Sequence, residues 1–240
     1  MDEGEQDWIR SGQHRFCLGT AALGMSYGIT NTSGMPTVDD AHEVIKTAYE
    51  LGIRCFDTAP AYGAAEERLG GALMDCPCAI VTKLNLSDEE CSKGDAEIEA
   101  ACYAKTMQSR RHLGDSLVVL LMHNIRFFRI AAAWRTAKRL REDGVVAQLG
   151  VSVYSPEEAL EAIKEPDVTC LQIPFNLLDW RWRDPEIREA FQVCPTPTVR
   201  CTLRATSGGP AGTSGCNDSR PESPTARSPL RSRGLLAPGH

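Results

Sequence analysis

The segment RCFDTAPAYGAAEERLGGAL holds two side chains capable of acid–base chemistry, Asp57 and Tyr62, and the later chain supplies two more, Lys83 and His123. Side chains of these types suit a reaction in which negative charge develops on a substrate oxygen atom. A site for that reaction needs a proton donor and a group that stabilises the charge. A carboxylate, a phenol, an ammonium and an imidazole would together meet this need.

Each of the four residues has a chemical role to play in such a site. A tyrosine has an ordinary pKa of about 10, so Tyr62 would exchange protons near neutrality only beside a cation, and Lys83 is the candidate. Asp57 would keep Lys83 charged and oriented, because an ion pair favours both ionised forms. His123 would donate a hydrogen bond to the substrate oxygen and set its angle.

Each of these residues alone also fits a structural role. Asp57 could cap the next turn and Lys83 could be a solvated loop residue. His123 could bond a backbone carbonyl, and Tyr62 could pack beneath a loop. The combination of four required residue types in the required order favours the catalytic interpretation.

Short apolar or β-branched runs predict the strands that would position these side chains. The expected strands are 16–23, 53–56, 78–84, 117–122, 145–153 and 168–173. Helical patterns lie between them, including 38–51, 88–112, 127–143 and 185–191. This alternation predicts right-handed βαβ units and a parallel sheet, and in a β/α barrel the strand ends meet at one mouth, where the chemistry takes place.

From about Phe16 to Phe191 the sequence resembles the aldo-keto reductase family. The resemblance is carried, in order, by the motifs FDTAPAYGAAEERLGGAL, VTKL, LGDSLVVLLMHN, REDGVVAQLGVSVYSPEEAL and LQIPFNLLDWRW. It implies a (β/α)8 barrel of the TIM type that uses NADPH, less often NADH, to reduce aldehydes and ketones. Accordingly, the sequence contains no G-x-G-x-x-G dinucleotide motif.

The resemblance also implies cofactor-binding residues. Ser152 and Gln172 stand where the family binds the nicotinamide carboxamide, and Phe175 stands near the aromatic residue that stacks on the nicotinamide. The family often has an asparagine directly after that serine, whereas this chain has Val153. For Ser152 and Gln172, binding and structural roles are equally open. The substrate implied is a small-molecule carbonyl compound, and we favour a small polar or sugar-like aldehyde.

Charge and cysteine usage exclude several other classes of protein. Residues 192–240 hold six arginines and two acidic residues, so the net charge of −6 leaves about −10 on residues 1–191. An acidic body of this kind argues against nucleic-acid binding. The absence of a long apolar run argues against a membrane protein.

The ten cysteines are scattered along the chain, and the only close pair is Cys76 and Cys78. No second cysteine pair and no histidines follow at zinc-finger spacing. We therefore expect no metal, reduced thiols and a cytoplasmic location.

The composition changes near Val193, after which the chain is rich in Pro, Ser, Gly, Thr and Arg. We therefore expect two parts: an incomplete barrel of about six βα units over residues 1–192, and a disordered tail over 193–240. Six strands cannot close a barrel, and the elements with which the family binds the cofactor phosphates would follow the missing strands. This leaves two functional hypotheses. The first is an NADP-dependent carbonyl reductase, with this chain a shortened form of weak or no activity, and the second is a non-catalytic binding or regulatory protein on the same scaffold.

Overall fold

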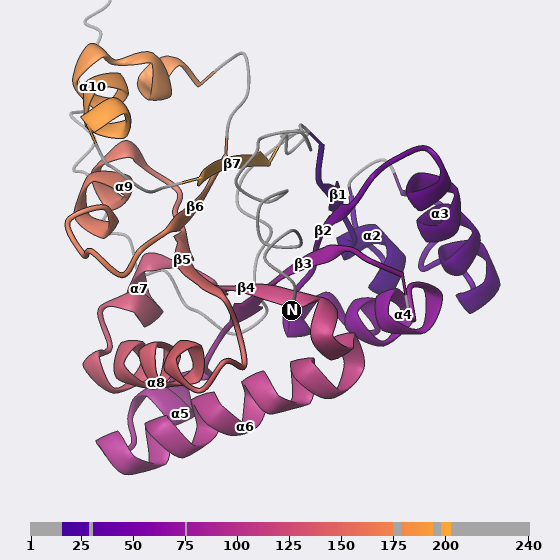
Figure 1. Cartoon of the computed structure of the whole chain (residues 1–240), viewed down its shortest axis with the longest axis horizontal. Coiled ribbons are helices and arrows are strands. Elements are labelled where there is room, and N and C mark those ends of the chain that lie inside the picture. Colours follow the sequence, from indigo (N-terminus) through magenta and orange to yellow (C-terminus); the bar gives the residue numbers. More distant parts are fainter. Residues whose placement is uncertain (1–15, 29–30, 75, 175–178, 194–197, 203–240) are drawn as a thin grey trace, which may run out of the picture. The chain divides into compact units, whose positions relative to one another are not determined.

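The computed structural model describes residues 16–28, 31–74, 76–174, 179–193 and 198–202 (Figure 1). The described strands form a parallel sheet in which each strand pairs with the next one along the chain. They are β1 (Leu18–Gly19), β2 (Cys55–Asp57), β3 (Ala79–Leu84), β4 (Leu117–Met122), β5 (Gln148–Ser152), β6 (Cys170–Pro174) and β7 (Thr198–Thr202).

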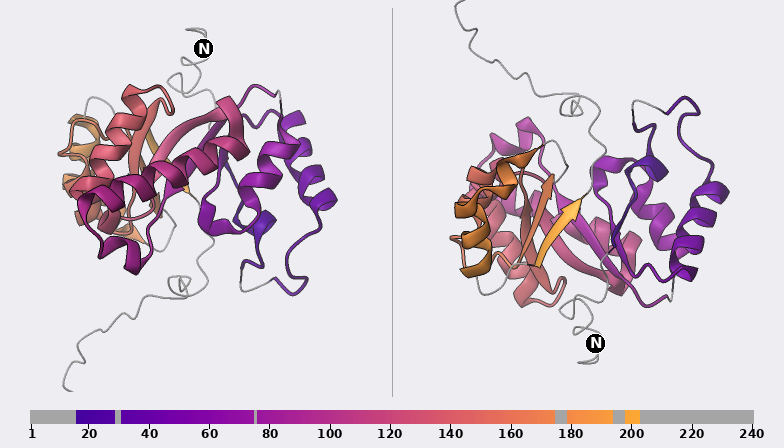
Figure 2. Two further views of the ribbon diagram at one scale, coloured as in Figure 1. Left: turned by 90° about the horizontal axis from the view of Figure 1, so that it is seen from below. Right: turned by 90° about the horizontal axis from the view of Figure 1, so that it is seen from above.

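Helices follow the strands and lie along the outer face of the curled sheet (Figure 2). The α-helices are α2 (Ala21–Gly24), α3 (Val38–Glu50), α4 (Ala65–Ala72), α5 (Asp88–Cys91), α6 (Asp95–Leu113), α7 (Ile125–Phe128), α8 (Ala131–Glu142), α9 (Pro156–Ala162) and α10 (Pro185–Val193). Short 3₁₀ turns are η1 (Pro60–Tyr62), η2 (Gly114–Ser116) and η3 (Trp180–Arg183). Among the described helices, none combines the length and the apolar character needed to cross a bilayer.

The predicted α/β class is confirmed, because parallel strands alternating with helices form a curled half-barrel. Alternate residues of each strand face opposite sides of the sheet. On β3, Ile80 and Leu84 belong to the large apolar cluster shared with the helices, whereas Val81 belongs to a smaller cluster of strand residues on the inner face. The parity of a residue within its strand therefore decides whether it faces the helices or the interior of the half-barrel.

Helix α3 illustrates how local sequence sets the element boundaries. Thr37 caps α3: its side chain accepts a hydrogen bond from the Asp40 amide, and the Asp40 carboxylate accepts from the Thr37 amide. This capping box satisfies two backbone donors at the helix start. Gly52 follows the helix with a φ of 94°, a conformation that glycine adopts without steric cost. The helix predicted over 38–51 is confirmed.

Two predicted elements are shorter than expected. The strand predicted over 16–23 contains only β1, because Ala21–Gly24 forms the helical turn α2; its small residues give the extended conformation little support. The single helix predicted over 88–112 is divided into α5 and α6 at Gly94, which lies in the extended region as the N-cap of α6.

The sheet also contains one strand more than the six units expected. Strand β7 consists of five residues, TVRCT, and pairs with β6 from Cys170 to Pro174. It lies within the 193–240 segment for which no ordered structure was expected. Thr and Val favour a pleated strand, and this short signal is obscured by the Pro- and Ser-rich residues around it. The described residues all belong to one compact unit, Met1–Gly208, and the division at residue 192 stays a prediction.

Candidate active site

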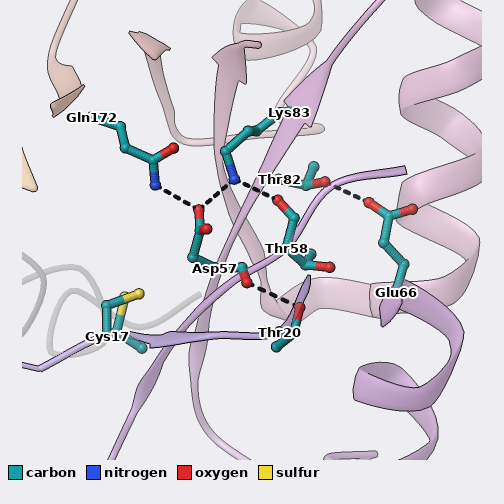
Figure 3. Close-up of polar contacts among 9 residues, drawn as sticks. Cys17, Thr20, Asp57, Thr58, Glu66, Thr82, Lys83 and Gln172 are labelled. Atoms are coloured by element: carbon teal, nitrogen blue, oxygen red, sulfur yellow. Dashed lines mark hydrogen bonds and ion pairs between the residues drawn. The ribbon is translucent and has the colours of Figure 1, made fainter. Parts of the chain in front are cut away.

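A buried ion pair connects the ends of β2 and β3. Lys83 Nζ lies 2.6 Å from Asp57 Oδ1 and donates a second hydrogen bond, of 2.9 Å, to the carbonyl oxygen of Thr58 (Figure 3). Only 1% of Lys83 and 7% of Asp57 is exposed to solvent. Both side chains have the inward parity of their strands, so the pattern of the sheet itself brings the ammonium and the carboxylate together.

The surroundings of Lys83 favour its charged form. Burial acts to lower the pKa of this lysine, but the charge of Asp57, the Tyr62 side chain and the hydrogen bond to Asp57 act against it, and the net result is a raised pKa. Lys83 is therefore an ammonium at neutral pH. A buried cation of this kind acts on any oxygen nearby that gains negative charge.

The Tyr62 ring lies next to Lys83 and is more exposed to solvent than the ion pair. The centre of its ring is 4.9 Å from Lys83 Nζ. The His123 ring approaches it edge-on, with centroids 6.0 Å apart and planes at 88°. Tyr62 and His123 are half-buried, whereas Asp57 and Lys83 are enclosed. A ligand reaching the site would meet the phenol and the imidazole first.

The turn that carries Tyr62 is seated against Gly24 of α2. The Tyr62 amide donates to the carbonyl oxygen of Ala59 at 2.9 Å, and the Ala64 amide donates to that of Gly24 at 3.0 Å. A Cβ atom at Gly24 would lie 2.1 Å from the Tyr62 carbonyl oxygen and 2.3 Å from the Ala65 nitrogen. The close approach of the two backbones requires a glycine at this position.

Asp57 is held by two residues for which the sequence indicated no such contact. Gln172 on β6 donates from Nε2 to Asp57 Oδ1 at 2.9 Å. Thr20, which is fully buried, donates from its backbone nitrogen and its hydroxyl to the Asp57 carbonyl oxygen, at 2.9 and 3.0 Å. The carboxylate thus accepts hydrogen bonds from Lys83 and from Gln172 (Figure 3).

The two residues implied for carboxamide binding lie side by side. Ser152 on β5 and Gln172 on β6 are register partners, and both are buried. Val153, which follows the serine, is a core residue whose amide donates to the Gln172 carbonyl oxygen at 2.9 Å. A hydroxyl and a primary amide can match both the donor and the acceptor of a carboxamide. Phe175 lies outside the described residues.

Glu66 on α4 is a buried carboxyl that sequence reasoning missed. It accepts hydrogen bonds from Thr82 on β3 and, at 3.1 Å, from Ser109 on α6. Burial raises the pKa of Glu66 above its ordinary value, against the lowering effect of these two hydrogen bonds. Because Thr82 directly precedes Lys83 and faces the opposite side of the sheet, Glu66 fixes the helix after Tyr62 to the strand that carries Lys83. An acidic residue at a core position of an amphipathic helix is the signal that could have found it.

The structure therefore brings together Asp57, Tyr62, Lys83 and His123, with Ser152 and Gln172 on the neighbouring strands of the same face. The carboxylate, ammonium and phenol suit proton transfer to an oxygen atom. In the described part of the chain, no cluster of three His, Cys, Asp or Glu side chains could hold a metal ion.

Comparison with known proteins identifies the family. The family model "Aldo/keto reductase family" matches residues 15–211, and the chain belongs to this family, whose members generally use nicotinamide cofactors to act on small-molecule carbonyl compounds. This membership supports an oxidoreductase function.

Individual relatives agree with this assignment. D-threo-aldose 1-dehydrogenase of a Pseudomonas species is 25% identical over 211 residues, which are 73% of this chain and 63% of that protein. Among solved structures, the Pseudomonas aeruginosa protein PA4992, assigned to the aldo-keto reductases, is 26% identical with a TM-score of 0.61, over 76% of this chain and 71% of its own. The holo form of the Bacillus halodurans aldo-keto reductase AKR11C1 is 23% identical with a TM-score of 0.59, over 78% and 60%, and supports the fold. The chain spans about 63% of the length of the curated relative.

Proposed function

We propose that this protein is an NADPH-dependent oxidoreductase that reduces an aldehyde or ketone to an alcohol, with Tyr62 as the general acid. The observation that carries the proposal is the enclosed ion pair of Asp57 and Lys83 beneath the Tyr62 ring. An ammonium held beside the phenol would stabilise the negative charge that develops on the phenol oxygen when Tyr62 gives up its proton.

In this mechanism Tyr62 donates its hydroxyl proton to the carbonyl oxygen as negative charge develops there. Lys83 stabilises the tyrosinate left behind, and Asp57 keeps the ammonium charged and in position. His123 donates a hydrogen bond to the same substrate oxygen and orients it. General-acid assistance of this kind contributes about 10²–10⁴ to the rate.

A nicotinamide cofactor would supply the hydride. Ser152 and Gln172 are the residues that would bind its carboxamide, because their hydroxyl and amide groups lie on adjacent strands on the same face as the proton donor. The side-chain amide of Gln172 donates one N–H to Asp57. Its side-chain oxygen would accept a hydrogen bond from the carboxamide N–H. Cofactor position is thereby tied to the position of the ion pair.

The substrate class that we propose is a polyhydroxylated, sugar-like aldehyde. A partly exposed phenol and imidazole at the mouth offer polar groups to such a ligand, and the name of one relative, D-threo-aldose 1-dehydrogenase, specifies an aldose. The proposal extends only the class of ligand to this chain.

The test is NADPH consumption by the purified full-length chain with a panel of aldoses, aliphatic aldehydes and aromatic aldehydes, with NADH assayed in parallel. Tyr62→Phe removes the proposed proton and should lower kcat by roughly 10²–10⁴, whereas Tyr103→Phe alters an exposed tyrosine on α6 and should leave it unchanged. Equal rates in the wild-type protein and in Tyr62→Phe would refute the proposal.

A fluorescence titration with NADPH distinguishes the alternative of a non-catalytic binding protein. Cofactor binding without turnover of any aldehyde would favour that alternative. Absence of both binding and turnover would remove the oxidoreductase proposal for this chain.

A further inference from the structure

Two cysteine side chains meet at the edge of the sheet, away from the proposed proton donor. Cys55 Sγ lies 3.1 Å from Cys17 Sγ, with the Cys55 thiol as donor. Figure 3 shows Cys17 beside the strand that leads to Thr20. Cys17 is exposed, whereas only 1% of Cys55 is accessible to solvent. Cys17 can therefore meet a reagent from solution, whereas Cys55 is enclosed with its sulfur beside that of Cys17.

The backbone geometry suits a covalent bond between these two sulfurs. Leu18 pairs with Phe56 in the parallel ladder of β1 and β2. Cys55 is the first residue of β2, and Cys17 is the residue directly before β1. Neighbouring strands lie about 4.8 Å apart, which falls within the usual Cα–Cα range of disulfides, about 4.4–6.8 Å. Only a side-chain adjustment of about 1 Å separates the sulfurs from the bonded distance of about 2.05 Å.

We propose that Cys17 and Cys55 are an oxidative modification site that forms a reversible disulfide when the protein meets a peroxide. The Cys17 thiolate attacks the peroxide, the O–O bond breaks, and a sulfenic acid and water result. Cys55 then attacks the Cys17 sulfur, the S–S bond forms as the S–O bond breaks, and a second water leaves. The two thiols lose two electrons and two protons, and hydrogen peroxide is reduced to two molecules of water.

The position of the bond gives it a structural consequence. Strand β1 has two residues and, among the described strands, lies at one end of the sheet order and pairs with β2 alone. A disulfide at this point closes a loop from Cys17 to Cys55 and so restricts the unfolded chain. It would also fasten β1 just before Thr20, whose hydrogen bonds hold the Asp57 carbonyl. The modification stands independently of the proposed reductase activity.

Peptide mapping tests the proposal on the unmodified chain. Trypsin releases Cys17 on the peptide 16–46 and Cys55 on the peptide 55–68, and each of these peptides contains one cysteine. Reduced protein would be exposed to equimolar hydrogen peroxide, alkylated under denaturing conditions and digested without reductant. The expected product is a cross-linked pair of these two peptides, lighter by two hydrogens, in several-fold excess over every other cysteine pair and absent after dithiothreitol.

Variants and stability complete the test. Cys17→Ser should abolish the cross-link, whereas Cys91→Ser on α5 should leave it intact. Oxidation should raise the thermal midpoint by roughly 5–15 °C in the wild-type protein and in Cys91→Ser only. The proposal is overturned if Cys17 is recovered alkylated or as a sulfinic acid, or if Cys55 is linked instead to Cys170, which shares its apolar cluster. The peptide result needs no variant, so failure of Cys17→Ser to fold would not obscure it.

Discussion

Lys83 Nζ lies 2.6 Å from Asp57 Oδ1, and the lysine side chain is almost wholly removed from water. An ion pair enclosed in this way contributes in two respects. It fixes the relative position of β2 and β3 at their carboxyl ends, and it maintains a positive charge beneath Tyr62. Loss of one partner should therefore be costly, because the other charge is left buried and unpaired.

Replacement of Lys83 by Met should lower the free energy of unfolding by about 3–5 kcal/mol. The double variant Asp57→Asn with Lys83→Met should recover part of that loss. Lys93→Met is the matched control, since its pair with Glu89 is exposed at 3.4 Å and should change stability by no more than about 0.5 kcal/mol. Urea denaturation measures all three, and equal losses in Lys83→Met and Lys93→Met would contradict the role given to the buried pair.

The stability of the protein should depend on pH through Glu66. Burial raises the pKa of this carboxyl in the folded state above its ordinary value of 4.5. The folded protein then holds the proton more strongly than the unfolded chain, so the stabilising contribution is complete below the ordinary pKa. It is lost as the pH rises through the raised value.

Glu66→Gln removes this titration. The unfolding free energy of the wild-type protein should accordingly fall relative to Glu66→Gln as the pH rises from about 4.5. Glu67→Gln, an exposed neighbour on the same helix, should show no such trend. Denaturation at a series of pH values provides the measurement. If the unfolding free energy of the wild-type protein instead rises relative to Glu66→Gln with increasing pH, the folded state favours the carboxylate.

Gly24→Ala should disturb the Tyr62 turn, because the added Cβ would lie 2.1 Å from the Tyr62 carbonyl oxygen. A displacement of about 1 Å at a reacting group can lower the rate by about 10², and we expect a loss of kcat/KM of that order. Gly19→Ala is the control, since the Cβ that it adds would have no such neighbour within 4 Å. Steady-state kinetics of both variants provide the measurement. An unchanged kcat/KM in Gly24→Ala would mean that the Tyr62 turn can move aside without loss of activity.

Gln172 and Ser152 should differ in their effects. Gln172→Leu removes a hydrogen bond to a buried carboxylate and should cost about 1–3 kcal/mol of stability without cofactor. Ser152→Ala should leave the stability of the cofactor-free protein nearly unchanged while raising the Kd for NADPH by roughly tenfold. Denaturation combined with NADPH titration separates the two roles. If Gln172→Leu retains full stability, its contact with Asp57 does not support the fold.

Much of the site could be predicted because the sequence pattern indicates where the strands end. The β-branched run 78–84 and the continuous apolar run 117–122 are typical of strands in a parallel sheet, so Lys83 and His123 were expected at strand ends. The contact between Gln172 and Asp57 could not be read in this way. It joins residues 115 positions apart, and the direction of each side chain depends on sheet curvature, which no local pattern specifies.

The burial of Glu66 and the strand β7 were not predicted from the sequence, for related reasons. Glu66 shares the helical spacing of the buried Leu69, but its position alone does not identify its partners, the hydroxyls of Thr82 and Ser109. Strand β7 depends on the β6 backbone that it pairs with, which outweighs the Pro- and Ser-rich composition nearby. In both cases tertiary contacts override the local signal.

The order of the sheet has a consequence for how the protein is made. Since every described strand pairs with the one synthesised just before it, each new βα unit can dock on a template that has already left the ribosome. Assembly can proceed vectorially from the amino terminus, and no strand has to wait for a distant segment to be translated before finding its neighbour.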